Sequence, residues 1–91
     1  GNNYEACIIT AQNALNDFPY TNMREDFSLL IMKSKYELAQ MSVESKRLQR
    51  YQDAEDECYG FINEYPDSKN CDLAKNYIEK CKKHTSSIET E

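Results

Sequence analysis

Tyr51–Pro66 reads YQDAEDECYGFINEYP, and Tyr4–Pro19, 47 residues earlier, reads YEACIITAQNALNDFP. The same offset relates Tyr4–Tyr36 to Tyr51–Lys83. Six pairs of positions are identical: Tyr4/Tyr51, Asn16/Asn63, Pro19/Pro66, Ile31/Ile78, Lys33/Lys80 and Lys35/Lys82. A repeat with a period of this size is typical of stacked units that bury their apolar faces against one another. The chain is therefore expected to present a surface to partners.

Apolar residues recur every three or four positions in four segments, which is the spacing of one face of an α-helix. The 91 residues include only two glycines and two prolines, so little interrupts these segments. We expect one all-α domain, residues 1–91, made of about four antiparallel helices. The expected helices are residues 4–18, 22–41, 47–65 and 69–83, followed by a polar tail at 84–91.

Two Pro-containing segments mark helix ends. The residue before proline avoids helical dihedral angles, so Phe18-Pro19 and Tyr65-Pro66 end the first and third helices. Thr21 and Ser68 follow at positions that suit the N-caps of the next helices. The second helix has an expected inward stripe that includes a small residue, where helices can approach closely. This stripe is Phe27, Leu30, Ile31, Ser34, Leu38 and Met41.

Ser42–Arg50 (SVESKRLQR) breaks the apolar pattern and is expected to be a connection. It contains three basic residues, Lys46, Arg47 and Arg50, which we call the basic cluster, and only one acidic residue, Glu44. Arginine pairs well with carboxylates and is enriched at interfaces, so the cluster is a candidate for docking an acidic partner surface. The alternative is a solvated segment that balances the acidic residues Asp53, Glu55, Asp56 and Glu57.

Three tyrosines lie off the expected core stripes, and tyrosine is a frequent anchor in protein interfaces. These candidates are Tyr20, Tyr36 and Tyr59. The alternative is that they cover neighbouring repeats, because each helix of an array has a second face against the next unit. For the same reason we expect the open ends of the array to self-associate.

Size and charge exclude several classes of function. A chain this short buries only about 60 to 65% of its unfolded surface, which leaves little room for an enclosed active site. The net charge of -5 argues against nucleic acid as a ligand. No catalytic sequence motif occurs, and the single histidine, His84, falls in the expected tail. We expect neither an enzyme nor a cofactor.

The four cysteines, Cys7, Cys58, Cys71 and Cys81, lack the paired spacings of zinc sites. Cys81 and His84 form one close pair with no second pair to match it, so we expect no metal. Each cysteine falls on or beside an apolar helix face, where a free thiol packs as a small hydrophobe. Cys58 and Cys71 lie on adjacent expected helices but miss facing positions by about one helical turn, so we expect no disulfide.

No apolar run approaches the roughly 18 residues that a membrane-spanning helix needs. The first residues, Gly1-Asn2-Asn3, lack the layout of a signal peptide. We expect a soluble chain that is part of a longer protein, with any targeting segment upstream.

The spacing of the repeated segments resembles the second helix and closing proline of a tetratricopeptide repeat. The residues that carry this likeness are Tyr4, Cys7, Ala14, Leu15 and Pro19, echoed by Tyr51, Ala54, Phe61, Ile62 and Pro66. The usual period is 34 residues, so an offset of 47 implies about 13 extra residues. We expect them in a longer first helix and in the Ser42–Arg50 connection.

A more specific sequence pattern is similar to the C-terminal repeats of the outer-membrane assembly lipoprotein family BamD. The similarity covers about Tyr4–Lys83. The pattern comprises Tyr36-Glu-Leu-Ala39, Ser42-Val-Glu44, Lys46, Arg50-Tyr51, Ala54, Phe61-Ile62 and Glu64–Lys69. The resemblance implies a right-handed tetratricopeptide-like array and a non-enzymatic scaffold at the periplasmic face of the outer membrane, which helps to insert β-barrel proteins.

The partners that this resemblance implies are the periplasmic domains of the barrel-assembly subunit and accessory lipoproteins. Attachment to the membrane would occur only through a lipid anchor outside this sequence. The alternative is a generic tetratricopeptide module that binds extended peptides or their C-termini. Its carboxylate-gripping cations would include Arg24, Lys33 and Lys35, which are scattered along the second helix.

Overall fold

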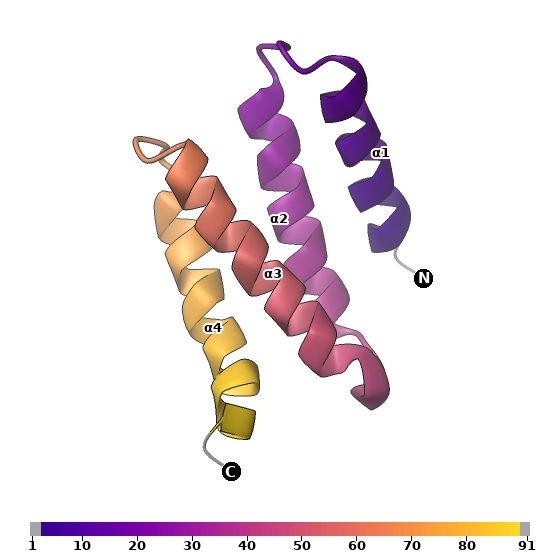
Figure 1. The fold of residues 1–91 in the computed structure, drawn as a ribbon, viewed down its shortest axis with the longest axis vertical. Helices are drawn as coiled ribbons and strands as arrows, with labels where there is room; N and C mark the ends of the chain where they lie inside the picture. Colours follow the sequence, from indigo (N-terminus) through magenta and orange to yellow (C-terminus); the bar gives the residue numbers. More distant parts are fainter. Residues whose placement is uncertain (1–2, 90–91) are drawn as a thin grey trace.

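The structure, a computed structural model, describes the backbone of residues 3–89 and the side chains of residues 3–86. The described residues form four helices and no strand, which confirms the all-α prediction. The helices are α1 (Tyr4–Asp17), α2 (Arg24–Gln40), α3 (Glu44–Glu64) and α4 (Cys71–Glu89). Each helix runs antiparallel to the preceding one and packs against it, and α3 crosses in front of α2 (Figure 1). The molecule is a flat stack of 44 × 31 × 18 Å.

The 47-residue repeat is present in the backbone around the two hairpin turns. The last residues of α1 and α3, Asp17 and Glu64, differ by 47, and so do the first residues of α2 and α4, Arg24 and Cys71. The residues before the two prolines have nearly the same dihedral angles: φ -131°, ψ 67° at Phe18 and φ -126°, ψ 62° at Tyr65. The α1–α2 and α3–α4 hairpins are therefore closed by the same turn.

Equivalent backbone hydrogen bonds close the two turns. The N–H of Thr21 donates to the carbonyl of Phe18 at 3.1 Å, and the N–H of Ser68 donates to that of Tyr65 at 3.0 Å. The predicted N-caps are wrong, because α2 begins at Arg24 and α4 at Cys71, three residues after Thr21 and Ser68. Their hydroxyls instead accept from the N–H two residues ahead, at 3.2 Å for Thr21 and 3.0 Å for Ser68. This bond holds the turn before the helix starts.

The core consists of three apolar clusters, and α2 contributes to all of them. The first joins α1 to α2 through Ile8, Ala11 and Ile31. The second joins α2, α3 and α4 through Met32, Cys58, Phe61, Ala74 and Ile78. The third joins the same helices through Tyr36, Ala39, Tyr51, Ala54 and Cys81. Helix α2 is thus covered by apolar contacts on two faces.

The predicted connection at Ser42–Arg50 is wrong. Helix α3 begins at Glu44 rather than at residue 47, so residues 41–43 alone connect α2 to α3. The apolar pattern breaks here because the first turn of α3 is exposed and needs no apolar face. Helix α3 is therefore 21 residues long, and α2 has 17.

The predicted polar tail is also wrong over residues 84–89, because α4 continues to Glu89; residues 90–91 lie outside the described part. Two side-chain contacts to α3 support this extension. The His84 ring stacks on Tyr51 with centroids 3.9 Å apart, and the Thr85 hydroxyl donates to Glu55 Oε1 at 3.0 Å. A polar segment therefore remains helical where a neighbouring helix lies beside it.

Candidate protein-binding surfaces

The basic cluster lies on the first two turns of α3. Arg47 donates to the Ser42 carbonyl at 3.0 Å, and Arg50 donates to the Ser42 hydroxyl at 2.9 Å. Arg50 also forms an ion pair with Glu5 Oε1 at 2.6 Å, which links α3 to α1. Lys46 is exposed. The two arginines therefore hold the α2–α3 turn, and of the three candidates Lys46 presents its charge most freely.

The acidic residues after the cluster have other partners. Glu57 forms an ion pair with Lys35 of α2 at 2.8 Å, and Asp53 accepts from Gln49 at 3.0 Å. Glu55 accepts from Thr85, as described above. The three basic residues therefore do not form ion pairs with this acidic run.

An open groove lies between α1, α2 and α3. Its volume is about 270 Å³, and its apolar lining is Ile8, Ile9 and Leu38. Its charged lining includes Glu5, Lys35, Arg50 and Asp53. Ile9 is 57% exposed, so a large aliphatic side chain is available to solvent at this groove. Apolar side chains with a charged rim are typical of surfaces that bind other proteins.

The three tyrosine candidates have different environments. Tyr20 is 98% exposed and Tyr59 is 46% exposed, whereas Tyr36 is only 4% exposed. The interpretation of Tyr36 as a surface residue is wrong, because its ring stacks on Tyr77 at 4.2 Å. Its hydroxyl accepts from Gln40 at 3.1 Å, and burial raises the pKa of the phenol. Tyr36 is a core residue on the second buried face of α2.

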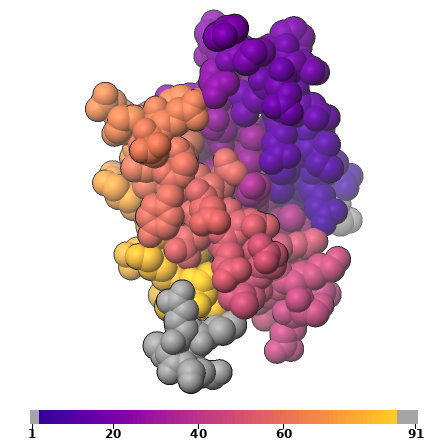
Figure 2. Space-filling model, in the orientation of Figure 1, coloured from indigo at the N-terminus to yellow at the C-terminus, as the bar shows by residue number. Residues whose placement is uncertain are grey.

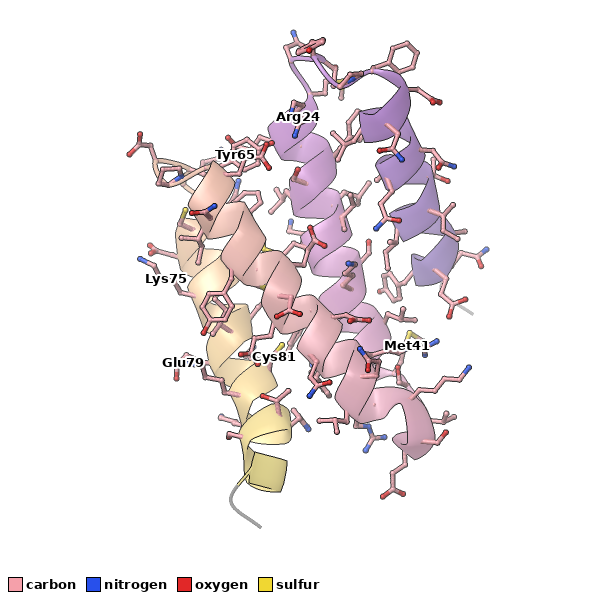
Figure 3. The ribbon with its side chains drawn as sticks, in the orientation of Figure 1. Arg24, Met41, Tyr65, Lys75, Glu79 and Cys81 are labelled. Atoms are coloured by element: carbon pink, nitrogen blue, oxygen red, sulfur yellow. The ribbon has the colours of Figure 1, made fainter. Side chains whose placement is uncertain are left out.

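The α1–α2 turn carries a second exposed apolar group. Phe18 is 67% exposed and Met23 is 47% exposed, close to Tyr20 in the chain. The equivalent α3–α4 turn packs on the start of α2. There the Arg24 guanidinium lies 2.8 Å from Glu64 Oε1, and Ser68 donates to Glu25 Oε2 at 2.8 Å. Figure 3 shows Arg24 at the start of α2, near Tyr65 at the end of α3. The first turn has the same geometry with a more exposed and more apolar surface.

The cysteines pack as predicted. Cys58, Cys71 and Cys81 are buried, Cys7 is half-buried, and all four thiols are free. Burial raises the pKa of Cys58 to about 12 and that of Cys81 to about 11, so both remain protonated at neutral pH. Within the described residues no group of three or more metal-ligating side chains comes together. Protonated, buried thiols are poor nucleophiles and poor metal ligands.

Sequence reasoning missed the apolar part of the groove and the second face of α2. Ile9 gave a signal, because it is a large aliphatic residue on the polar side of its helix. The second face of α2 also has a sequence signal. Apolar residues recur there at helical spacing, beside the predicted stripe: Met32, Tyr36 and Ala39.

Comparisons with known proteins found no match: no family model, no curated protein and no solved structure matches the chain. Among the helices over residues 3–89, none combines the length and apolarity that a membrane span requires. The candidate binding residues are those of the groove, the exposed α1–α2 turn and the start of α3.

Proposed function

We propose that this chain is a non-enzymatic protein–protein interaction scaffold, built as a right-handed tetratricopeptide-like array of helical hairpins. Two hairpins that share one turn geometry and one 47-residue relationship support this proposal. Helix α2 supports it further, since it packs against its own hairpin on one face and against the next hairpin on the other. That double packing is what a stacked array requires.

The observation that carries the proposal is the exposure of large apolar side chains outside the core. Ile9 lies at the open groove, and Phe18 and Tyr20 lie at the α1–α2 turn. Exposed apolar groups of this kind act as anchors when a partner covers them and polar residues surround them. The two most deeply buried thiols are protonated and the His84 ring is stacked on Tyr51, so these groups are poorly suited to catalysis.

We further propose that its partners are the periplasmic domains of the barrel-assembly subunit and accessory lipoproteins, at the periplasmic face of the outer membrane. This part of the proposal is based on the similarity to the BamD family alone. The residues that carry the similarity have structural roles here: Ser42 and Arg50 bond to each other at the α2–α3 turn, and Tyr51 packs in the core. A protein that shares these residues is expected to form the same α2–α3 turn.

The alternative function, capture of peptide C-termini, needs cations that converge on one carboxylate. Arg24 already forms an ion pair with Glu64, and Lys35 forms one with Glu57. Lys33 is exposed, but Arg24 and Lys35 are already paired and so cannot join it in binding a carboxylate. We therefore favour folded protein domains as partners over free peptide ends.

Binding of the purified periplasmic domains, measured by isothermal titration calorimetry, tests the proposal. Ile9→Glu is expected to raise the dissociation constant tenfold or more, because it removes an apolar anchor worth about 1.5–3 kcal/mol. Asn13→Glu is the matched control, since it adds the same charge to an exposed site on α1 outside the groove lining. Absence of binding by the natural chain, or equal effects of the two substitutions, would refute the proposal.

A further inference from the structure

The 47-residue relationship also shows which surface of the first hairpin lacks a neighbour. In the observed interface, α2 packs on α3 through ion pairs and apolar contacts. Arg24 pairs with Glu64, Lys35 pairs with Glu57, and the Ser28 and Tyr65 hydroxyls are 3.5 Å apart. Between these polar contacts, Met32 and Tyr36 of α2 pack in clusters with Phe61 and Tyr51 of α3.

Helix α1 has the counterpart of the α3 side of this interface. Subtracting 47 from Tyr51, Ala54, Glu57, Phe61, Glu64 and Tyr65 gives Tyr4, Cys7, Thr10, Ala14, Asp17 and Phe18. We call these six residues the α1 docking face. The counterparts of the three buried α3 residues are only half-buried, and Phe18 is exposed where Tyr65 is half-buried. Figure 2 shows α1, in indigo, at one edge of the molecule, where α3 does not cover it.

The α1 docking face also carries a charge that its α3 counterpart has neutralised. Glu64 is paired with Arg24, whereas Asp17 is exposed and forms no ion pair with the described residues. Next to Asp17 in the chain, Phe18 replaces Tyr65 and has no hydroxyl to form a hydrogen bond. A helix that covers this face would therefore place a cation opposite Asp17 and an apolar side chain opposite Phe18.

Helix α4 cannot supply that helix from a second copy of the chain. Adding 47 to the α2 residues that face α3 and α4 gives polar residues on α4, apart from the buried Cys71, which is the counterpart of Arg24. The polar residues are Asp72, Lys75, Asn76, Glu79, Lys82, Lys83 and Ser86, and every one is exposed. Figure 3 shows Lys75 and Glu79 pointing away from the other helices. The face of α4 that would continue the stack is thus polar, so a second copy could not dock there through contacts like those between α2 and α3.

We propose that the α1 docking face binds an amphipathic helix of a partner protein, antiparallel to α1 and with the chemistry of α2. That helix carries an arginine opposite Asp17 and large apolar residues at the positions of Met32 and Tyr36. Charge complementarity at Asp17 and continuity with the observed α2–α3 interface support this occupant. The inference rests on the proposed function as an interaction scaffold, and it adds a second surface distinct from the groove.

The probe is a capped, fluorescent peptide of residues 22–41 with Ser28→Leu, so that leucine faces Phe18. Fluorescence anisotropy with the full chain is expected to show saturable binding. Asp17→Arg should weaken it about fivefold or more, and Arg24→Glu in the peptide should restore binding to that variant. Asp72→Arg, which makes the same charge reversal on the polar face of α4, is the control and should leave the affinity unchanged.

Three results would overturn the inference. No saturable binding would mean that the α1 docking face does not accept such a helix. Weakening by Glu64→Arg but not by Asp17→Arg would mean that the peptide displaces α2 of the chain. Concentration-dependent dimerisation that Asp17→Arg abolishes, seen by sedimentation, would identify the occupant as a second copy. None of these results affects the dependence of domain binding on Ile9, so the proposed function is tested separately.

Discussion

Two methionines provide the sharpest test of how α2 packs: Met32 within the helix and Met41 at its C-cap. The spacing of apolar residues predicts Met41 on the inward stripe and leaves Met32 off it. In the structure Met32 is 0% exposed and Met41 is 52% exposed. The same chemical change at both positions therefore separates the structure from the pattern.

Met32→Ala is expected to lower the free energy of unfolding by about 2–5 kcal/mol. Met32 packs among Phe61, Ala74 and Ile78, which come from two other helices, so the core cannot easily collapse into the space left behind. A domain of this size has a total stability of about 5–14 kcal/mol, so the loss is a large fraction of it. Met41→Ala should change the free energy by no more than about 0.5 kcal/mol, because the side chain is mostly in solvent.

Urea unfolding, followed by circular dichroism at the helical minimum, measures both changes. Helix propensity slightly favours alanine, so it cannot account for a loss at Met32. Thermal unfolding should agree, with a fall of about 4–8 °C for each kcal/mol in a domain of this size. If Met41→Ala costs as much as Met32→Ala, the packing of α2 between two hairpins is incorrect.

Two further predictions follow from the α2–α3 turn and from the buried thiols. Arg50→Ala should destabilise the chain by about 1–2 kcal/mol, because it removes the hydrogen bond to Ser42 and the ion pair with Glu5. Lys46→Ala should have little effect. Similar urea unfolding midpoints for the two variants would contradict this prediction. The free energy of unfolding should also fall as pH rises above about 9, which is the ordinary pKa of a thiol. Burial raises the pKa to about 11 for Cys81 and to about 12 for Cys58. Between about pH 9 and these values, unfolding releases protons that the folded thiols hold, so a rise in pH favours the unfolded state. Burial also raises the pKa of the core tyrosines Tyr36, Tyr51 and Tyr77, which acts in the same direction, so a urea midpoint that stays constant between pH 8 and pH 11 would contradict the burial of these groups.

The proline turns were predictable because their cause is local. Steric conflict with the proline ring ends the helix at Phe18 and at Tyr65 whatever lies nearby. The helix starts were less predictable, because Thr21 and Ser68 can either cap a helix or close a turn with the N–H two residues ahead. The backbone path after each proline selects the turn, and that path depends on how the next helix packs.

The candidate site was predictable only in part. The basic residues of the first turns of α3 stand out in composition, but their bonds to Ser42 and Glu5 join residues up to 45 positions apart in the chain. The groove brings Ile9, Leu38 and Asp53 together from three helices, and no local pattern contains that information. Tyr36 was misplaced for the same reason, since one stripe was assigned to a helix that has two buried faces.

The sequence by itself determined that the chain is helical, that two hairpins share one turn, and that the cysteines pack as apolar residues. These properties depend on helical spacing and on the sterics of proline, which act over a few residues. The tertiary structure alone decided that Met32 and Tyr36 are core residues, that Arg50 links α3 to α1, and that α1 has an open face while α4 has a polar one. Each of these depends on which helix lies against which, and that is fixed by the combined burial of side chains that are distant in the chain.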